Sequence, residues 1–405
     1  MTAPLPVVIV GAGMAAYAVA REFRKLDKAT ALLIVAGDGG GAYAKPMLSN
    51  AFALGKAAPQ LLSQSAEQMA ATLDARVLTR TEVTAIDSGA GAIETAQGER
   101  IGYSKLVLAL GAQPIRLAVD GDAAAEILSV NHIDDYAQMR ERLAALGRPA
   151  RVAILGAGLI GCEFADDLVA GGHQVTLIDP NVRPLAALAA PALSDALARA
   201  WTALPITLRL GTTAASVRRA DGALVVGLAD GGIVEADLVL SAVGLRPSIA
   251  LATAAGIATA RGIVIDGFGQ TSVPGIYALG DCAEYSTADG GAVMPYIAPM
   301  LAAARAIGAT LAGTPTPIDL KADAVLVKTA SLKLALAPPP HGSRGEWVSA
   351  LDGERTIARF VDEQGLVRGF GLSLHTPALR QSLLAELGSD PGFSVRGSDP
   401  GRVGG

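Results

Sequence analysis

The stretch Val7–Ala16, which reads VVIVGAGMAA, decides the fold of this chain. Its first four residues are apolar and β-branched, and the run is too short for a helix, so it predicts a buried strand. The run stops at Gly11 and Gly13, and residues 17–26 then carry apolar side chains at helical spacing. A strand, a glycine turn and a helix in this order are the context in which Gly-x-Gly-x-x-Gly/Ala indicates a dinucleotide-binding unit.

Each small residue of this motif has a separate role. Gly11 permits the tight turn, Gly13 lets the backbone approach a pyrophosphate, and Ala16 lets the helix lie close to the strand. The N-terminus of the helix then faces the anion. For one such motif taken alone, a glycine-rich turn in another kind of α/β unit is an alternative interpretation.

The same pattern occurs a second time in Arg151–Glu163, which reads RVAILGAGLIGCE. Gly156, Gly158 and Gly161 occupy the three small-residue positions, again between a predicted strand and a predicted helix. Because each copy has its own strand and helix, two dinucleotide-binding folds in one chain explain the repetition better than chance does. The sequence therefore predicts an α/β protein with two Rossmann-like domains.

Length and composition narrow the class of protein. A chain of 405 residues with 51% hydrophobic and 18% charged residues should form two or three well-buried domains. A net charge of -5 gives no electrostatic support for binding nucleic acid or a membrane surface. No apolar run reaches membrane-spanning length, and the first strand begins soon after Met1, so we expect a cytoplasmic protein without membrane insertion.

The cysteines and histidines argue against two kinds of site. Cys162 and Cys282 are far apart and neither belongs to a C-x-x-C pair, which excludes a thiol relay between neighbouring cysteines. The four histidines are scattered, so their spacing predicts no metal site.

A carboxylate after the second strand of each fold should bind ribose hydroxyls. In the first fold that strand is residues 31–35 and the available acid is Asp38, which could also be a plain turn aspartate. In the second fold Asp179 directly follows the predicted strand 174–178. A carboxylate there accepts the 2′-hydroxyl and repels a 2′-phosphate, so it favours NADH, although Arg183 nearby could attract a phosphate.

Two further motifs give the chain a family resemblance. Tyr43–Ser49 reads YAKPMLS, and Thr271–Asp281 reads TSVPGIYALGD. Together with the two glycine motifs, and in this order, they resemble the two-dinucleotide flavoprotein reductases related to glutathione reductase. Within that superfamily the chain is most similar to the rubredoxin-NAD reductase family, and the resemblance runs to about residue 385.

The resemblance assigns cofactors, FAD and NADH, to the two folds. It implies that Lys45 lies near the N5 edge of the flavin with Pro46 against the ring, and that Glu163 lies near the nicotinamide; these are the expected catalytic residues. The other implied FAD contacts are Gly11, Gly13, Ala16, Asp38, Gly111, Asp281 and Lys328. The implied NAD contacts are Gly156, Gly158, Gly161, Asp179 and Gly244.

Three of these assignments have structural alternatives. Lys45 precedes a proline, which should hold it extended, and from physical reasoning alone it could be a solvated surface lysine. Glu163 could be an acid in the first turn of a helix, stabilised by the helix dipole. Lys328 could be an edge-strand lysine that deters aggregation.

The same motifs and resemblance predict the domain organisation. We expect a discontinuous FAD-binding domain at 1–113 and 247–316, an NAD-binding domain at 114–246, and a small α+β C-terminal domain at 317–388. The last of these should contain five strands and a closing helix. Residues 389–405 are rich in glycine, serine and proline and should form a disordered tail.

The predicted function is transfer of electrons from NADH through FAD to rubredoxin, a small iron protein, by a chain that we expect to be monomeric. Lys45 with Pro46-Met47 resembles the rubredoxin branch, whereas reductases of oxygenase ferredoxins tend to have arginine and two prolines there. A ferredoxin or flavorubredoxin partner is the first alternative. A thiol or peroxide enzyme would need a cysteine near Lys45, and none is there. A non-catalytic NADH-sensing flavoprotein would keep every motif above.

Overall fold

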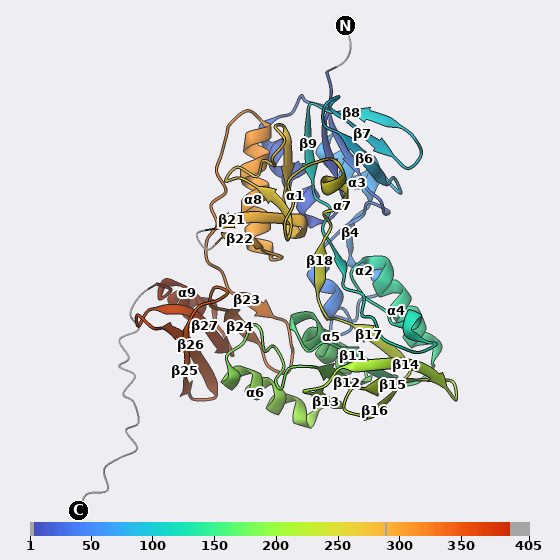
Figure 1. Ribbon diagram of the computed structural model, residues 1–405, viewed down its shortest axis with the longest axis vertical. Helices are drawn as coiled ribbons and strands as arrows, with labels where there is room; N and C mark the ends of the chain where they lie inside the picture. The colour runs from blue at the N-terminus through green and yellow to red at the C-terminus, as the bar shows by residue number, and fades with distance from the viewer. Residues whose placement is uncertain (1–3, 288–289, 389–405) are drawn as a thin grey trace, which may run out of the picture. The chain divides into compact units, whose positions relative to one another are not determined.

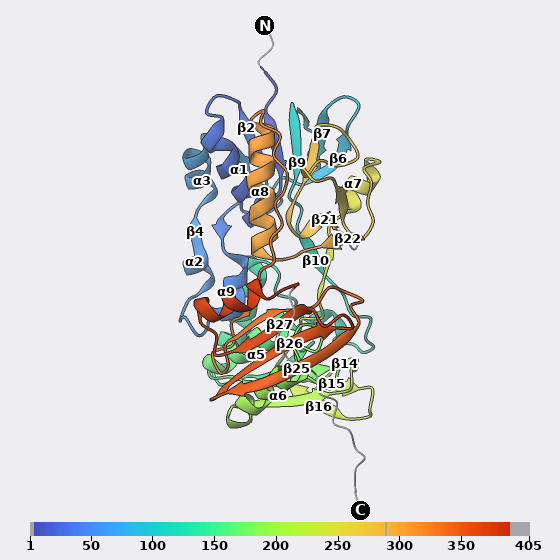
Figure 2. The ribbon, with the colours of Figure 1, turned by 90° about the vertical axis from the view of Figure 1, so that its left-hand side faces the viewer.

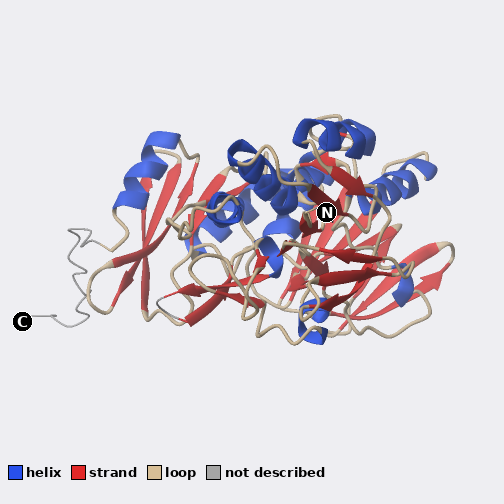
Figure 3. Cartoon of the chain, turned by 90° about the horizontal axis from the view of Figure 1, so that it is seen from above, coloured by secondary structure: helices blue, strands red, loops and turns tan. Residues whose placement is uncertain are grey.

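The computed structural model describes residues 4–287 and 290–388. Contacts divide the chain into two compact units, Met1–Pro180 with Pro205–Lys321, and Asn181–Leu204 with Ala322–Gly405. Helices and strands alternate along most of the chain (Figures 1 and 3), so the structure has the predicted α/β character. The expected tail, 389–405, lies outside the described residues.

The first motif lies at the centre of a five-stranded parallel sheet. The strand order is β20-β9-β1-β2-β5, with β1 at Val7–Val10, β2 at Leu32–Val35, β5 at Arg76–Leu78, β9 at Lys105–Leu108 and β20 at Ile276–Ala278. All four residues of β1 are buried, as expected for an apolar run in a parallel sheet.

Two helices pack side by side in this part of the first unit. They are α1 (Met14–Leu26) and α8 (Ile297–Leu311), and Figures 1 and 2 show them adjacent. Gly308 allows this close approach, because a Cβ there would come within 2.7 Å of Glu22 Cβ. The closing segment of the predicted FAD domain therefore packs on its opening helix.

Smaller elements complete this part of the chain. A three-stranded sheet contains β6 (Val83–Asp87), β7 (Ala92–Thr95) and β8 (Arg100–Gly102), and another contains β19 (Ile263–Ile265), β21 (Ala283–Thr287) and β22 (Gly290–Val293). β3 (Ala42–Tyr43) pairs with β4 (Leu62–Gln64). The short helical elements are η1 (Lys45–Asn50), α2 (Ala58–Leu61), α3 (Ala66–Leu73), α7 (Ala250–Ala254) and η4 (Gly280–Cys282).

The second motif lies in a four-stranded parallel sheet of order β13-β12-β11-β17. Its strands are β11 (Arg151–Leu155), β12 (Gln174–Asp179), β13 (Ile206–Leu210) and β17 (Leu238–Ser241). The accompanying elements are η2 (Ala124–Glu126), α4 (Ile133–Ala145), α5 (Leu159–Ala170), and an antiparallel sheet of β14 (Ala214–Ala220), β15 (Ala223–Leu228) and β16 (Ile233–Ala236). The repetition in sequence is thus a repetition of strand, turn and helix in space.

The two segments at the predicted boundaries between the FAD and NAD domains pair with each other. β10 (Ala112–Pro114) and β18 (Leu245–Pro247) form a two-stranded antiparallel ribbon. Hydrogen bonds at both ends extend it, from Ile115 N to Gly244 O at 3.1 Å and from Ser248 N to Gly111 O at 3.0 Å. The chain therefore leaves and re-enters the first fold through one paired segment.

The second unit is built on an antiparallel sheet of order β23-β24-β27-β26-β25. Figure 2 shows its long strands β25 (Gly345–Asp352), β26 (Arg355–Asp362) and β27 (Val367–Ser373). The other elements are β23 (Val325–Val327), β24 (Leu334–Ala337), α6 (Pro191–Ala200), η3 (Trp201–Ala203) and α9 (Pro377–Ala385). Phe370, Leu372 and Leu383 belong to its buried core.

Candidate functional site

The first glycine turn leaves open space in front of a helix N-terminus. Gly11 has φ +112°, and a Cβ there would lie 2.3 Å from Ala109 O, so only glycine fits. Gly13 is the N-cap of α1, and a Cβ at Gly13 would meet nothing within 4 Å. The fully buried Ala16 lies in the first turn of α1. This cradle of backbone N–H groups fits a pyrophosphate.

The second turn repeats this geometry. Gly156 has φ +105°, and a Cβ there would lie 2.6 Å from Ala242 O, while the N-cap Gly158 again faces open space. At Gly161 a Cβ would lie 1.9 Å from Gly156 O, which shows why the third position is glycine. Both turns therefore have room for a dinucleotide backbone at the same place relative to the strand and helix.

Asp179 is the last residue of β12 and contacts the second turn. Its Oδ2 accepts a hydrogen bond of 2.7 Å from Ala157 N, between the first two glycines. A carboxylate oxygen can accept a further hydrogen bond from a ribose hydroxyl. Asp179 thus lies where an acid of the NAD fold should be, buried against the turn.

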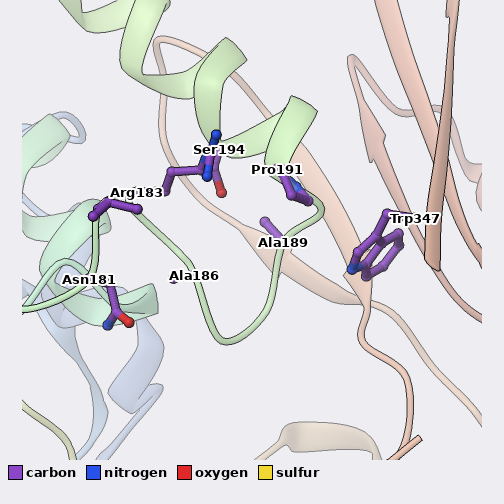
Figure 4. Close-up of a pocket in the computed structure, with 8 residues that line it drawn as sticks. Asn181, Arg183, Ala186, Ala189, Pro191, Ser194 and Trp347 are labelled. Atoms are coloured by element: carbon purple, nitrogen blue, oxygen red, sulfur yellow. The ribbon is translucent and has the colours of Figure 1, made fainter. Parts of the chain in front are cut away.

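Arg183, which could attract a 2′-phosphate, has an acidic partner in the second unit. Its Nε donates a 2.9 Å hydrogen bond to Asp195 Oδ1. Arg183, Asn181, Ser194 and Trp347 are among the residues that line a cavity of about 210 Å³, with Trp347 on a separate strand (Figure 4). The ion pair offsets the charge that would attract a phosphate.

Asp38 has an unexpected partner. Its Oδ1 accepts from Gly40 N at 2.7 Å, and its Oδ2 lies 2.6 Å from Nε2 of His132. His132 caps the start of α4, and the ring of Tyr43 packs edge-on against it at 5.8 Å between centroids. The predicted FAD acid is therefore held by the N-cap residue of α4, a contact that no local sequence signal indicates.

This contact changes both pKa values. The hydrogen bond from His132 lowers the pKa of Asp38, with burial opposing it. The hydrogen bond to Asp38 raises the pKa of His132, burial opposes this, and the charges of Asp38, Asp134 and Asp135 add to it. Each partner therefore favours the charged form of the other.

Lys45 opens a helical turn, so the prediction of an extended residue before Pro46 is wrong. Met47 N donates to Ala44 O at 2.8 Å, which closes the η1 turn around Pro46, and Ala44 is the extended residue instead. Burial lowers the pKa of Lys45, while the charges of Asp281 and Asp135 raise it. The fold thus places the Lys-Pro motif within electrostatic range of Asp281, one of the predicted FAD contacts.

Glu163 contacts the same Lys-Pro segment. It is 1% exposed, and its Oε2 accepts a 2.6 Å hydrogen bond from Ser49 Oγ. It lies beyond the first turn of α5, so the alternative of a first-turn acid at the helix dipole is wrong. One turn later Asp167 accepts hydrogen bonds from Phe52 N at 3.1 Å and Ala53 N at 2.8 Å. Sequence reasoning missed Ser49 and Asp167 because their partners are distant in the chain.

The aspartate of the later motif lies next to the first turn. Gly280 has φ +76°, and a Cβ there would be 2.9 Å from Ala15 Cβ, so η4 approaches α1 closely. Asp281 follows in η4. The next residue, Cys282, is fully buried, and burial raises its pKa to about 11, which keeps the thiol protonated.

The remaining predicted residues lie in three places. Gly111, with φ +66° and open space at its Cβ position, and Gly244, with φ +110°, adjoin the two ends of the β10–β18 ribbon. Lys328 directly follows β23 in the second unit. No group of His, Cys, Asp or Glu side chains in the described ranges could hold a metal ion. No helix of these residues is long and apolar enough to cross a membrane.

Comparison with known proteins gives two family matches. Residues 5–305 match the family of pyridine nucleotide-disulphide oxidoreductases, and residues 317–387 match the rubredoxin binding C-terminal domain. The first match ends within α8, and the second begins a few residues before Lys321, where the first unit ends.

Individual relatives match over nearly the whole chain. A rubredoxin-NAD(+) reductase of Alcanivorax borkumensis is 41% identical, covering 94% of this chain and 98% of the relative. A nitric oxide reductase FlRd-NAD(+) reductase of Aeromonas hydrophila is 36% identical, covering 93% and 96%. A chain of the crystal structure of the covalent putidaredoxin reductase-putidaredoxin complex superposes with a TM-score of 0.85 at 26% identity, covering 95% of this chain and 94% of that one.

Proposed function

Because this chain belongs to the pyridine nucleotide-disulphide oxidoreductase family, we propose that it takes electrons from NADH onto bound FAD and passes them to rubredoxin. The observation that carries the proposal is the repeated glycine turn, with open space before α1 and before α5 in one compact unit. The partner is supported by the match of residues 317–387 to a rubredoxin-binding domain and by the 41% identical relative.

The predicted binding residues form two sites, one for FAD and one for NADH. Gly13 and the N-terminus of α1 would hold the FAD pyrophosphate, and Asp281 would accept a ribitol hydroxyl. Gly158 and Asp179 would do the same for the pyrophosphate and ribose of NADH. When bound, NADH supplies a hydride that FAD accepts, and the flavin releases the electrons one at a time.

Lys45 and Glu163 would act at the reacting end of the two cofactors. Burial lowers the pKa of Lys45 and the charges of Asp281 and Asp135 oppose this, and in its charged form Lys45 would place a positive charge at the flavin edge. Ser49 holds the carboxylate of Glu163 through its hydrogen bond and would orient it toward the nicotinamide. Ser49 is thus a positioning residue between the Lys-Pro segment and α5.

A flavorubredoxin is the second candidate acceptor. It is favoured by one observation, the 36% identity to a nitric oxide reductase FlRd-NAD(+) reductase over 93% of the chain. A single-cysteine thiol or peroxide mechanism has little support, since Cys282 is buried and protonated. We further propose that the protein is a cytoplasmic monomer, which sedimentation and cell fractionation would test.

Rapid-mixing kinetics test the proposal. The purified protein should carry one FAD. Reduction of this FAD by NADH should be at least tenfold more efficient than reduction by NADPH, because the carboxylate of Asp179 accepts a hydrogen bond from the 2′-hydroxyl of NADH and repels the 2′-phosphate of NADPH. The reduced enzyme is then mixed with purified rubredoxin, flavorubredoxin and ferredoxin. Rubredoxin should be reduced fastest; a faster reaction with ferredoxin, or a colourless protein, would contradict the proposal.

A further inference from the structure

Residues 322–388 of the second unit carry several basic side chains, some of which are neutralised by acids. Arg355, Arg359 and Arg368 pair with Asp352, Glu386 and Asp362 at 3.1, 2.5 and 2.5 Å. Lys333, Arg344 and Arg380 form no ion pair with any residue in the described ranges. A cation without an ion pair can attract an acidic group of a partner without first breaking an ion pair within the chain.

Two of these three cations lie together at one end of the sheet. Lys333 directly precedes β24, and its carbonyl accepts a 2.9 Å hydrogen bond from Leu374 N, just after β27. Arg380 lies in α9, and its N–H bonds to Thr376 O at 3.0 Å in the first turn. His375 lies in the link from β27 to α9, next to Leu374 and five residues before Arg380.

The pKa of His375 reports the sign of the field at this end. Burial lowers the pKa of His375 most, and the positive charges of Arg380 and Lys333 lower this pKa further. Both of these side-chain charges are positive. His375 is therefore uncharged at neutral pH, and the fixed charge comes from Lys333 and Arg380.

An exposed apolar side chain lies at the same end of the sheet. Leu374 is 41% exposed and has φ +48°, a left-handed conformation that is strained for a leucine. Its carbonyl accepts a 3.3 Å hydrogen bond from Arg355 Nε, whose charge Asp352 already offsets. An apolar residue with unpaired charges beside it is the composition of a small, transient interface.

Arg344, the third unpaired cation, lies at the opposite end of the same sheet. It directly precedes Gly345, which pairs with Asp362 near the start of β27, whereas Lys333 adjoins the end of β27. The seven residues of β27 separate the two ends by about 20 Å. The chain thus provides a matched control with the same charge at a different place.

We infer that Lys333, Leu374 and Arg380 form the surface on which the electron-accepting partner docks, and that the partner presents an acidic face to it. The inference rests on the proposed function, deepens it by naming the contact residues, and lies within the 317–387 match. With a net charge of -5, the whole chain repels an acidic protein, so attraction must come from a local group of unpaired cations. Glu354, exposed in the β25–β26 turn, lies at the same end and offsets part of its positive charge.

The test compares single charge removals at the two ends of the sheet. The FAD-loaded, NADH-reduced enzyme is mixed with an acidic rubredoxin at about 0.05 M and about 0.5 M salt, where the Debye length falls from about 14 Å to about 4 Å. Lys333→Gln and Arg380→Gln should each lower the second-order rate about two- to fivefold at low salt and have little effect at high salt. Arg344→Gln should leave the rate unchanged, and Arg380→Lys should restore it.

Flavin reduction by NADH serves as the internal reference, and all four variants should match the unmodified enzyme in that step. Low-salt rates unaffected by Lys333→Gln and Arg380→Gln, or lowered equally by Arg344→Gln, would overturn the docking assignment. Failure of the unmodified enzyme to reduce rubredoxin would instead overturn the proposed function, so the two failures are distinguishable.

Discussion

At the scale of single residues, the most informative contact is the one between Asp38 and His132. Both side chains are about one-third exposed, at 32% and 35%, so solvent screens the pair and limits its energy. The pKa of His132 is raised above 6.5, so its stabilising contribution is complete below pH 6.5 and is lost as the pH rises through the folded-state value. The pKa of Asp38 is lowered below 3.8, so its contribution is complete above pH 3.8 and is lost below the folded-state value.

The Asp38–His132 pair should therefore contribute most to the free energy of unfolding between about pH 4 and pH 6.5. We expect His132→Gln to lower the free energy of unfolding by about 0.5 kcal/mol at pH 6, with a smaller loss at pH 9. Urea unfolding of the FAD-free protein at both pH values measures the difference. His341→Gln, at an exposed histidine, is the control and should change neither value. An equal loss at both pH values would mean that His132 contributes packing and no charge.

At the scale of elements, the second strand-turn-helix unit contains two glycines with opposite constraints. Gly158, the N-cap of α5, faces open space, whereas a Cβ at Gly161 would lie 1.9 Å from Gly156 O within the same turn. One glycine therefore leaves room for a ligand and the other permits the close packing of helix on strand. Both residues are glycine, so the sequence alone does not distinguish these two roles.

Substitution by alanine at these two positions should affect different properties of the protein. Gly158→Ala should leave the thermal unfolding temperature of the NADH-free protein nearly unchanged but weaken NADH binding at least tenfold, because the methyl group fills the space before α5. Gly161→Ala should destabilise the protein by about 1–3 kcal/mol, because α5 must move. Calorimetry and NADH titration measure the two quantities. Equal destabilisation by both would disprove the division of roles.

At the scale of the whole molecule, the predicted FAD site joins segments from both ends of the first unit. Gly13 and Lys45 come from its start, and Asp281 comes from the segment before α8, which packs on α1. The ribbon of β10 and β18 links this fold to the second one. A ligand that contacts all these segments must stabilise the folded chain by linkage.

Removal of FAD should accordingly lower the unfolding temperature of the protein. Saturation at about 100 times Kd adds about 2.7 kcal/mol to the free energy of unfolding. In the Asp281→Ala variant the affinity for FAD should fall. At the same total FAD concentration, the difference in unfolding temperature between FAD-free and FAD-supplemented protein should therefore be smaller than in the unmodified protein. Differential scanning calorimetry of the four samples measures this. A variant with an undiminished FAD effect would show that Asp281 makes no contact with the cofactor.

The sequence by itself determined the features that depend on local order. The Val7–Val10 and Arg151–Leu155 strands, the glycine turns and the helices after them follow from residue period and from glycine at positions that require positive φ. These features were enough to predict the α/β class and the two dinucleotide folds, and the Tyr43–Ser49 and Thr271–Asp281 motifs added the family resemblance. Several short strands, such as β16 and β22, were not predicted because three or four residues carry too little periodic signal.

Only the tertiary structure decided which distant residues meet. Ser49 holds Glu163, His132 holds Asp38, and Asp167 binds the backbone after the Lys-Pro segment, each across many residues of chain. Pairing across the sheet likewise decided which basic residues of the second unit are neutralised and which, like Lys333 and Arg380, are not. Hydrogen bonds and ion pairs act over a few ångströms in space, and local sequence does not encode that distance.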